Sequence, residues 1–313
     1  MDQIVAVTLN ATLTIGINAG GDEPINSLLG AYLAAIKEGD TKVVLYLDTE
    51  HFHLINANVS MFPMAPDNLV FSETESGQSF RLALSDLSSG KINALITSTN
   101  SQILMTETLK AKLWSRHTGY PGLLIPVPTK NKSGRSFLMD GGATNRVQDP
   151  QIFLSWAKLG SNFLKQYGIS EPKIGLANIA SERGFPELAK IHDCLGQVKG
   201  YQGYAEPANF WNGDIDLWLA EGFVGNLLLK NIEATALFQF HSLMIGLGEN
   251  ESVQAEVKAA AQKMLRYEDH LLSPFLMTSR KWIFRLHGNT KAEEIAKAFE
   301  FAARRYAIQS QTW

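Results

Sequence analysis

The chain has 313 residues, of which 45% are hydrophobic and 19% charged, and its formal net charge is −3 at pH 7. This balance is that of a globular protein with an ample core, and no basic block points to a nucleic-acid partner. The single cysteine, Cys194, excludes an internal disulfide. Residues Met1–Asn10 lack the basic and long apolar segments of a signal peptide, so we expect a cytoplasmic protein.

Short apolar segments alternate with segments of helical periodicity along the chain. The predicted strands are Ile4–Thr8, Thr14–Asn18, Lys42–Leu47, Val70–Phe71, Ile92–Thr97, Gly122–Val127, Arg135–Met139, Lys173–Asn178, Ile215–Leu219 and Trp282–Leu286. The predicted helices are Ile25–Lys37, Phe80–Leu87, Gln102–Trp114, Gln151–Gln166, Pro186–Cys194, Val224–Leu243, Val253–Leu265 and Ala292–Ala307. The alternation predicts an α/β fold with a mostly parallel sheet and helices on both faces. No linker divides residues 1–313, which form a single domain or two lobes that share one sheet.

Ligands of such folds bind beyond the carboxyl ends of the strands, so the loops that follow strands are the candidate site. These loops are rich in glycine and polar residues and comprise Asn18–Glu23, Thr97–Gln102, Asp140–Asn145, Asn178–Gly184, Ala220–Asn226 and His287–Thr290. Gly20, Gly21 and Asp22 fit either an anion site at a helix start or an ordinary turn. Gly141 and Gly142 fit the same two interpretations.

The segment Glu221–Asn226 is the most distinctive of these loops. Its two glycines and its asparagine precede a long helix, so the Asn226 amide is a candidate donor to a phosphate or a carbonyl oxygen. The alternative is a helix start where Gly222 allows close packing. Lys230 is either an anion ligand or a solvated lysine. His287 is either an acid or phosphate ligand, or a packed histidine.

Two further patterns in the sequence bear on other kinds of site. His51 and His53 have the spacing of a metal pair on a strand, but no further ligands accompany them, so no metal site is expected. The segment Ala236–Leu247 is unusually apolar for a helix end. It is interpreted as packing in the core or in a dimer, or as a surface that touches a bilayer or an acyl chain.

Taken together, the loops resemble those of the PlsX-type phosphate acyltransferases of bacterial phospholipid synthesis. The resemblance runs in order through the chain and rests on Asn18–Asp22, Thr97–Gln102, Val127–Thr129, Asp140–Ala143, Gly175–Ile179, Glu221–Asn226 with Lys230, and His287–Thr290. It implies an isocitrate/isopropylmalate dehydrogenase-like α/β fold, a homodimer and a peripheral tie to the membrane. It also implies acyl carrier protein and inorganic phosphate as substrates, and no cofactor.

Several positions depart from the family pattern. Asn18 stands where the family has an aspartate, and Thr99 and Gln102 stand where it has glycines. Glu221 replaces an aspartate, and Arg183 lies beside the position of a lost lysine. These changes fall in the loops expected to bind ligands, which favours an altered substrate or a lost activity over neutral change.

The roles of the candidate residues follow from a reaction in which phosphate itself is the nucleophile. Phosphate would be held by backbone N–H groups of the two glycine pairs and by Asn100, with positive charge from Arg183 or Lys230. Asn226 would stabilise the carbonyl oxygen, and His287 would act as an acid or as a phosphate ligand. The remaining substrate-binding candidates are Asp22, Asn178, Glu221 and Gly222.

Two other functions remain open on the same residues. One is a related enzyme on this fold, such as a phosphotransacetylase that uses coenzyme A; a decarboxylating dehydrogenase would need a cluster of acids that the sequence lacks. The other is a catalytically impaired homologue that binds an acyl carrier protein or a partner enzyme.

Overall fold

The structure is a computed structural model in which eleven strands of the described residues form one sheet. It describes residues 13–19, 24–56, 66–114, 120–130, 135–180, 185–248, 250–265, 275–277, 281–286 and 290–310. The strands are β1 Thr14–Asn18, β2 Lys42–Asp48, β3 Leu69–Thr74, β4 Ala94–Thr97, β5 Gly122–Pro128, β6 Arg135–Met139, β7 Ile174–Ala177, β8 Tyr201–Ala205, β9 Leu217–Leu219, β10 Phe275–Met277 and β11 Trp282–Arg285. Their order across the sheet is β3-β2-β1-β4-β11-β10-β5-β6-β9-β7-β8.

The strands form two parallel groups that run in opposite directions. Strands β3, β2, β1, β4 and β11 are parallel to one another, as are β6, β9, β7 and β8. Between the groups, β10 pairs antiparallel with β11 and β5, and β5 pairs antiparallel with β6. The mostly parallel α/β fold expected from the sequence is therefore confirmed, with an antiparallel centre.

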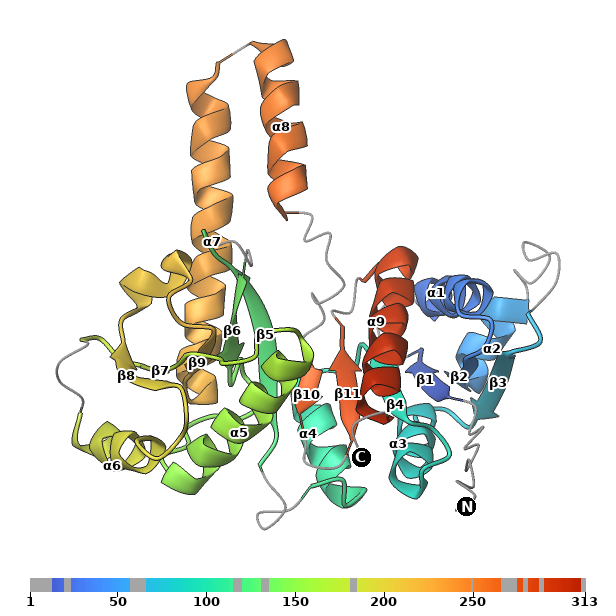
Figure 1. Cartoon of the computed structure of the whole chain (residues 1–313). Coiled ribbons are helices and arrows are strands. Elements are labelled where there is room, and N and C mark those ends of the chain that lie inside the picture. Colours follow the sequence, from blue (N-terminus) through green and yellow to red (C-terminus); the bar gives the residue numbers. More distant parts are fainter. Residues whose placement is uncertain are drawn as a thin grey trace, which may run out of the picture.

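Helices cover both faces of the sheet (Figure 1). They are α1 Pro24–Lys37, α2 Thr49–Asn56, α3 Ser79–Ser89, α4 Ser101–Lys110, α5 Pro150–Gln166, α6 Pro186–Leu195, α7 Gly222–Gly246, α8 Glu251–Leu265 and α9 Ala292–Ser310, with a 3-10 helix at Pro207–Asn212. Buried residues of α1, α9, α5 and α6 form one large cluster on one face. On the other face, α3 and α4 cover the first group of strands, and the 3-10 helix and the start of α7 cover the second.

The alternation of side chains along each strand explains these two layers. In β4, Ile96 belongs to the α1/α9 cluster, whereas Leu95 belongs to the α3/α4 cluster. In β11, Phe284 likewise belongs to the α1/α9 cluster and Ile283 to the α3/α4 cluster. Because successive side chains of a strand point to opposite faces, Thr97 lies on the α3/α4 face.

The register of the central strands brings the ends of the two groups to the same level of the sheet. Met139, the last residue of β6, pairs with Leu124 of β5, which pairs with Phe275 of β10. Phe275 pairs with Phe284 of β11, which pairs with Ile96 of β4. Ile96 and Phe284 are one residue from the ends of their strands. The opposing strands are therefore staggered, and their carboxyl ends meet near the middle of the sheet.

The structure corrects several sequence expectations. The helix predicted to reach Trp114 ends at Lys110, because Lys112 adopts a left-handed φ of 55°. His51 and His53 lie on α2, not on a strand, so their spacing places them on different sides of a helix. Strands β8 and β10 were not predicted, and the predicted strand Ile4–Thr8 lies outside the described residues.

Candidate functional site

The loop that follows β6 is organised around the side chain of Asp140. Asp140 is fully buried, and its carboxylate accepts hydrogen bonds of 2.7–3.0 Å from the N–H groups of Leu123, Gly142, Ala143 and Thr144 and from the Thr144 hydroxyl. Burial raises the pKa of Asp140, although these donors act in the opposite direction. The side chain therefore sets the path of the loop.

Helix α7 begins directly against this loop because two of its first residues are glycines. A Cβ on Gly222 would lie 2.0 Å from the carbonyl oxygen of Thr144. A Cβ on Gly225 would lie 1.9 Å from the carbonyl oxygen of Asp140. Both distances are too short for any side chain, so the glycines serve the close packing of the helix on the loop.

The two polar residues that flank these glycines differ in their surroundings. Glu221 occupies the N-cap position of α7, and its Oε2 accepts a hydrogen bond from the N–H of Val147 at 3.2 Å. Asn226 is exposed and lies beside Gly142, where an added Cβ would be 3.2 Å from the Asn226 Cβ and Cγ. Gly142 also has a φ of +118°, which favours glycine. The Asn226 amide is thus accessible to a ligand next to the loop.

The backbone amides of the glycine pair are already engaged within the loop. The Gly141 N–H donates to the carbonyl oxygen of Leu123 at 2.9 Å, and the Gly142 N–H donates to Asp140 Oδ1 at 3.0 Å. A phosphate bound by these two N–H groups would have to displace both bonds. Of the two interpretations of Gly141 and Gly142, an anion site or an ordinary tight turn, the geometry is that of the turn.

A second polar cluster lies where β1, β4 and β11 end. Asn18 and Thr97 are buried, and the Thr97 Oγ1 lies 3.1 Å from Asn18 Oδ1 and 2.9 Å from Thr99 Oγ1. The Asn18 Nδ2 donates to Ser79 Oγ at 3.1 Å. Arg285 donates from Nε to the carbonyl oxygen of Thr99 at 3.3 Å. This cluster, formed by the five residues named here, is called the strand-end cluster below.

Three other predicted side chains have structural partners. The Asn100 oxygen accepts a hydrogen bond from a backbone N–H in the first turn of α4, so Asn100 is the N-cap of that helix. Asn178 is buried at the end of β7, and its Nδ2 donates to the carbonyl oxygen of Ala180 at 2.6 Å. The Lys230 Nζ lies 2.7 Å from Glu233 Oε2, and its side chain is 63% exposed. Lys230 thus forms a surface ion pair on α7.

The structure describes only some of the residues predicted for the site. Five predicted residues lie outside the described part of the chain, namely Gly20, Gly21, Asp22, Arg183 and His287. Two central residues, Asp140 and Arg285, were not predicted. Asp140 opens a glycine turn directly after a buried strand, and Arg285 is the one charge within the predicted strand Trp282–Leu286. An acid at the start of a glycine turn and a single charge in an apolar strand are both visible in the sequence and could have indicated these two residues.

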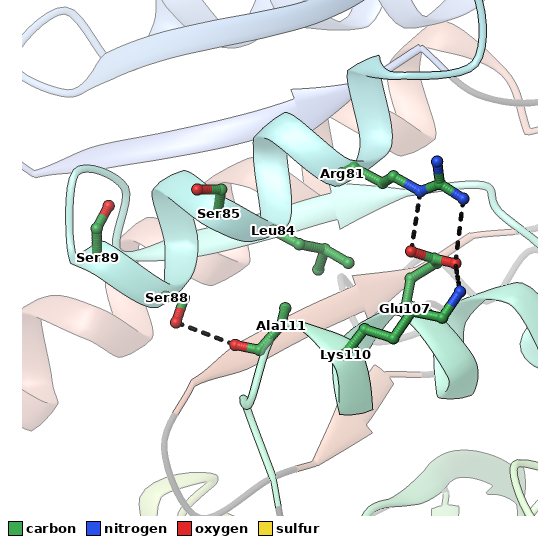
Figure 2. Close-up of a pocket in the computed structure, with 8 residues that line it drawn as sticks. All are labelled: Arg81, Leu84, Ser85, Ser88, Ser89, Glu107, Lys110 and Ala111. Atoms are coloured by element: carbon green, nitrogen blue, oxygen red, sulfur yellow. Dashed lines mark hydrogen bonds and ion pairs between the residues drawn. The ribbon is translucent and has the colours of Figure 1, made fainter.

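A groove of about 700 Å³ lies between α3 and α4, and none of its lining residues belongs to either polar cluster (Figure 2). Its two cations, Arg81 and Lys110, share the carboxylate of Glu107 at 3.0 and 2.7 Å. Hydrogen bonds from these cations hold the pKa of Glu107 below its ordinary value. The charged side chains of this groove form ion pairs with one another at the surface. We therefore place the candidate site at the Asp140 loop and the strand-end cluster, and not in the groove.

Comparison with known proteins identifies the family. Residues 13–303 match the family described as "Fatty acid synthesis protein". A phosphate acyltransferase of Wolbachia sp. subsp. Drosophila simulans is 28% identical over 330 residues, covering 94% of this chain and 93% of that protein. A phosphate acyltransferase of Tolumonas auensis is 26% identical over 255 residues, covering 79% and 74%.

Solved structures support the same fold. A phosphotransacetylase from Streptococcus pyogenes superposes with a TM-score of 0.62 at 13% identity, covering 96% of this chain and 95% of that one. At this identity the likeness concerns the fold alone. The family match spans both polar clusters and confirms the resemblance seen in the loop motifs. The chain therefore belongs to the fatty acid synthesis protein family, whose relatives include the phosphate acyltransferases.

Proposed function

We propose that the chain transfers an acyl group from the thioester of an acyl carrier protein to inorganic phosphate. A phosphate oxygen attacks the thioester carbonyl carbon, and the C–S bond then breaks. The thiolate leaves and takes up a proton, so the products are an acyl phosphate and a free thiol. Because a thiol of pKa about 8.5 leaves readily, the protein has two main tasks: to hold the anion and to stabilise charge on the carbonyl oxygen.

The observation that carries the proposal is the family match over residues 13–303, which includes every polar loop described above. The geometry around Asn226 supports it. This amide is exposed beside Gly142, at a helix start that Gly222 and Gly225 hold against the β6 loop. A neutral N–H donor at such a helix start suits an oxygen that gains negative charge in the transition state. We assign Asn226 to the carbonyl oxygen.

The test is phosphate-dependent loss of thioester from a long-chain acyl carrier protein, followed by mass, with acyl-coenzyme A run in parallel. We expect conversion with the carrier protein, and a loss of about 100- to 1,000-fold in Asn226→Ala, the usual effect of removing such a donor. Asn231→Ala, at an exposed position of the same helix, is the matched control. Full activity in Asn226→Ala would refute the assignment. Conversion of acyl-coenzyme A alone would favour a phosphotransacetylase-like enzyme.

A second candidate is a homologue that binds the carrier protein without turnover. It is favoured by the altered strand-end cluster, where Thr99 and Asn18 replace the glycine and aspartate of the family pattern. The Thr99 hydroxyl lies 3.4 Å from Asn18 Oδ1, so the two replacements contact each other. Binding of the carrier protein in calorimetry, with no conversion of either donor, would support this candidate.

Most of α7 extends away from the sheet, and α8 follows it in the projecting part of the chain (Figure 1). Within Ala236–Leu247, the exposed fractions of Leu237, Phe238, Leu243 and Ile245 are 58, 71, 51 and 81%. The expectation that this segment packs in the chain's own core is therefore wrong. No helix among the described residues is long and apolar enough to cross a membrane. We propose that a second copy of the chain covers this segment in a homodimer, because apolar side chains gather on it.

The oligomeric state decides this point. Light scattering should show a dimer for the wild type and a monomer for Phe238→Ser combined with Ile245→Ser. Ile36→Ser, at an apolar side chain of α1 that is 56% exposed, should stay dimeric. A monomeric wild type that floats with anionic liposomes would instead support the peripheral membrane contact expected from the sequence. A monomer that leaves liposomes unbound would refute both.

A further inference from the structure

Arg285 ends β11 on the same face of the sheet as the other strand-end side chains. It is paired in register with Thr97 of β4, which is paired in turn with Asn18 of β1. Two residues earlier, Ile283 and Leu95 are buried in the cluster beneath α3 and α4. Because side chains two residues apart share a face, Arg285 also points to the α3/α4 side. Its guanidinium therefore lies at the edge of a buried apolar layer.

The charge of Arg285 is only partly satisfied by the described part of the chain. Its Nε donates to the carbonyl oxygen of Thr99 at 3.3 Å, which uses one of the five N–H bonds of a guanidinium. Burial lowers the pKa of Arg285 from its ordinary value, and no acidic group in the described part of the chain counteracts this. An arginine stays charged in a protein, and a half-buried cation without a carboxylate is costly. Such a position suits an anionic ligand.

The other four residues of the strand-end cluster supply hydrogen bonds and no counter-charge. Asn18, Thr97, Thr99 and Ser79 are neutral and bonded to one another. Among the described residues, the Asp48 carboxylate is bonded to this network, and it accepts the N–H of Ser79 at 2.9 Å. The Asp48 carboxylate therefore accepts a backbone N–H of the first turn of α3. The neutral network holds the ends of β1 and β4 in place and leaves Arg285 as the cation of the strand-end cluster.

The topology places this cation where α/β sheets bind ligands. From β1 the chain crosses to β2 on one side, and from β3 it returns to β4 on the other side of β1. The strand order therefore reverses between β1 and β4, and in α/β sheets ligands bind outside the carboxyl ends of the strands at such a point. Arg285 follows on the next strand beyond β4, at the level of Thr97.

We propose that Arg285 binds inorganic phosphate at the strand-end cluster. It would supply the positive charge that was expected, from the sequence, of Arg183 or Lys230. This assignment rests on the proposed acyl transfer to phosphate. It makes Arg285 a substrate-binding residue whose effect falls on phosphate and not on the acyl donor.

The test is calorimetric titration of the full chain with inorganic phosphate and, separately, with coenzyme A, whose own phosphate groups are the other source of this chemistry. Arg285→Gln should weaken phosphate binding by about 10- to 100-fold, the value of a charge-assisted hydrogen bond. Arg285→Lys should recover part of the affinity. Arg81→Gln, which removes an exposed arginine paired with Glu107, should bind like the wild type.

In the acyl-transfer assay, Arg285→Gln should raise the KM for phosphate by a similar factor and leave the KM for the acyl donor unchanged. Equal phosphate binding by the wild type and a folded Arg285→Gln would overturn the proposal. So would a wild type that binds no phosphate at about 10 mM, well above ordinary KM values, or a variant that loses affinity for coenzyme A alone. Phosphate binding that needs Arg285, without any acyl transfer, would refute the proposed reaction and keep the anion site.

Discussion

Replacing Gly225 with alanine should push the start of α7 away from the β6 loop. A Cβ at this position would lie 1.9 Å from the carbonyl oxygen of Asp140, whereas real Cβ atoms essentially never come within 3.0 Å. The helix or the loop must therefore move by at least 1.1 Å, the difference between these distances. The obstacle is backbone fixed by the buried Asp140 side chain, so no flexible side chain relieves it.

The size of the effect follows from two opposing terms. Overpacking costs about 3 kcal/mol or more when the neighbour cannot move. Alanine gains about 1 kcal/mol over glycine in a helix interior. We expect a net loss of about 2 kcal/mol, which corresponds to a Tm lower by about 3 °C in a chain of this size. Because Asn226 is the next residue, a shift of this size should also reduce acyl transfer by about 100-fold.

Thermal unfolding and the thioester assay measure the two effects. Gly246→Ala is the matched control, because Gly246 ends the same helix and an added Cβ there meets nothing within 4 Å. This control should be as stable as the wild type or slightly more stable, with unchanged activity. A Gly225→Ala protein with wild-type Tm and activity would show that the contact between α7 and the loop is not needed.

Three further predictions concern single polar groups. Asp140→Asn should lower the free energy of unfolding by about 2 kcal/mol or more, because a buried N–H or hydroxyl of Thr144 loses its acceptor; an unchanged denaturant midpoint would contradict this. Lys230→Gln should leave the KM for phosphate unchanged and cost less than about 1 kcal/mol, as expected for an exposed ion pair; a large rise in KM would return Lys230 to the site. Burial alone would raise the pKa of Asp48, but hydrogen bonds from Ser79 and neighbouring groups hold it below 3.8. This carboxylate therefore adds stability above its unfolded pKa that is lost as the pH falls through the folded value, and Asp48→Asn should flatten the acid limb of unfolding midpoints measured from pH 6 to 3.

Periodicity was sufficient to predict the elements whose pattern is set by burial on one or both faces. Lys42–Leu47 is apolar and β-branched and forms β2, and Ile25–Lys37 has a helical apolar stripe and forms most of α1. Strand β10, with three residues, exists because β5 and β11 pair with it on both sides. Strand β8, YQGYA, lies at the sheet edge and carries little apolar signal. Such elements depend on tertiary partners, which a local pattern does not reveal.

The direction of the strands was also hidden from periodicity, because an apolar strand reads the same in either direction. Connection lengths contain part of this information. Only six residues join β5 to β6, and four join β10 to β11. A parallel crossover needs about a dozen residues or more, so these connections require antiparallel pairs. A fully parallel sheet would place all the candidate loops at one edge, whereas here they follow strands of opposite direction.

The stagger of the sheet explains how such loops could still act on one substrate. Met139 of β6 and Phe284 of β11 lie at the same level, three strand spacings or about 14 Å apart. On the α3/α4 face, Ala143 of the β6 loop packs against the apolar cluster that contains Ile283 of β11. The loop therefore spans part of the distance between the ends of β6 and β11. Arg285 at the end of β11 and Asn226 beside the β6 loop then lie on the same face of the sheet, on either side of its centre. Phosphate at the first and a thioester carbonyl at the second would meet between them, which assigns one reactant to each group of strands.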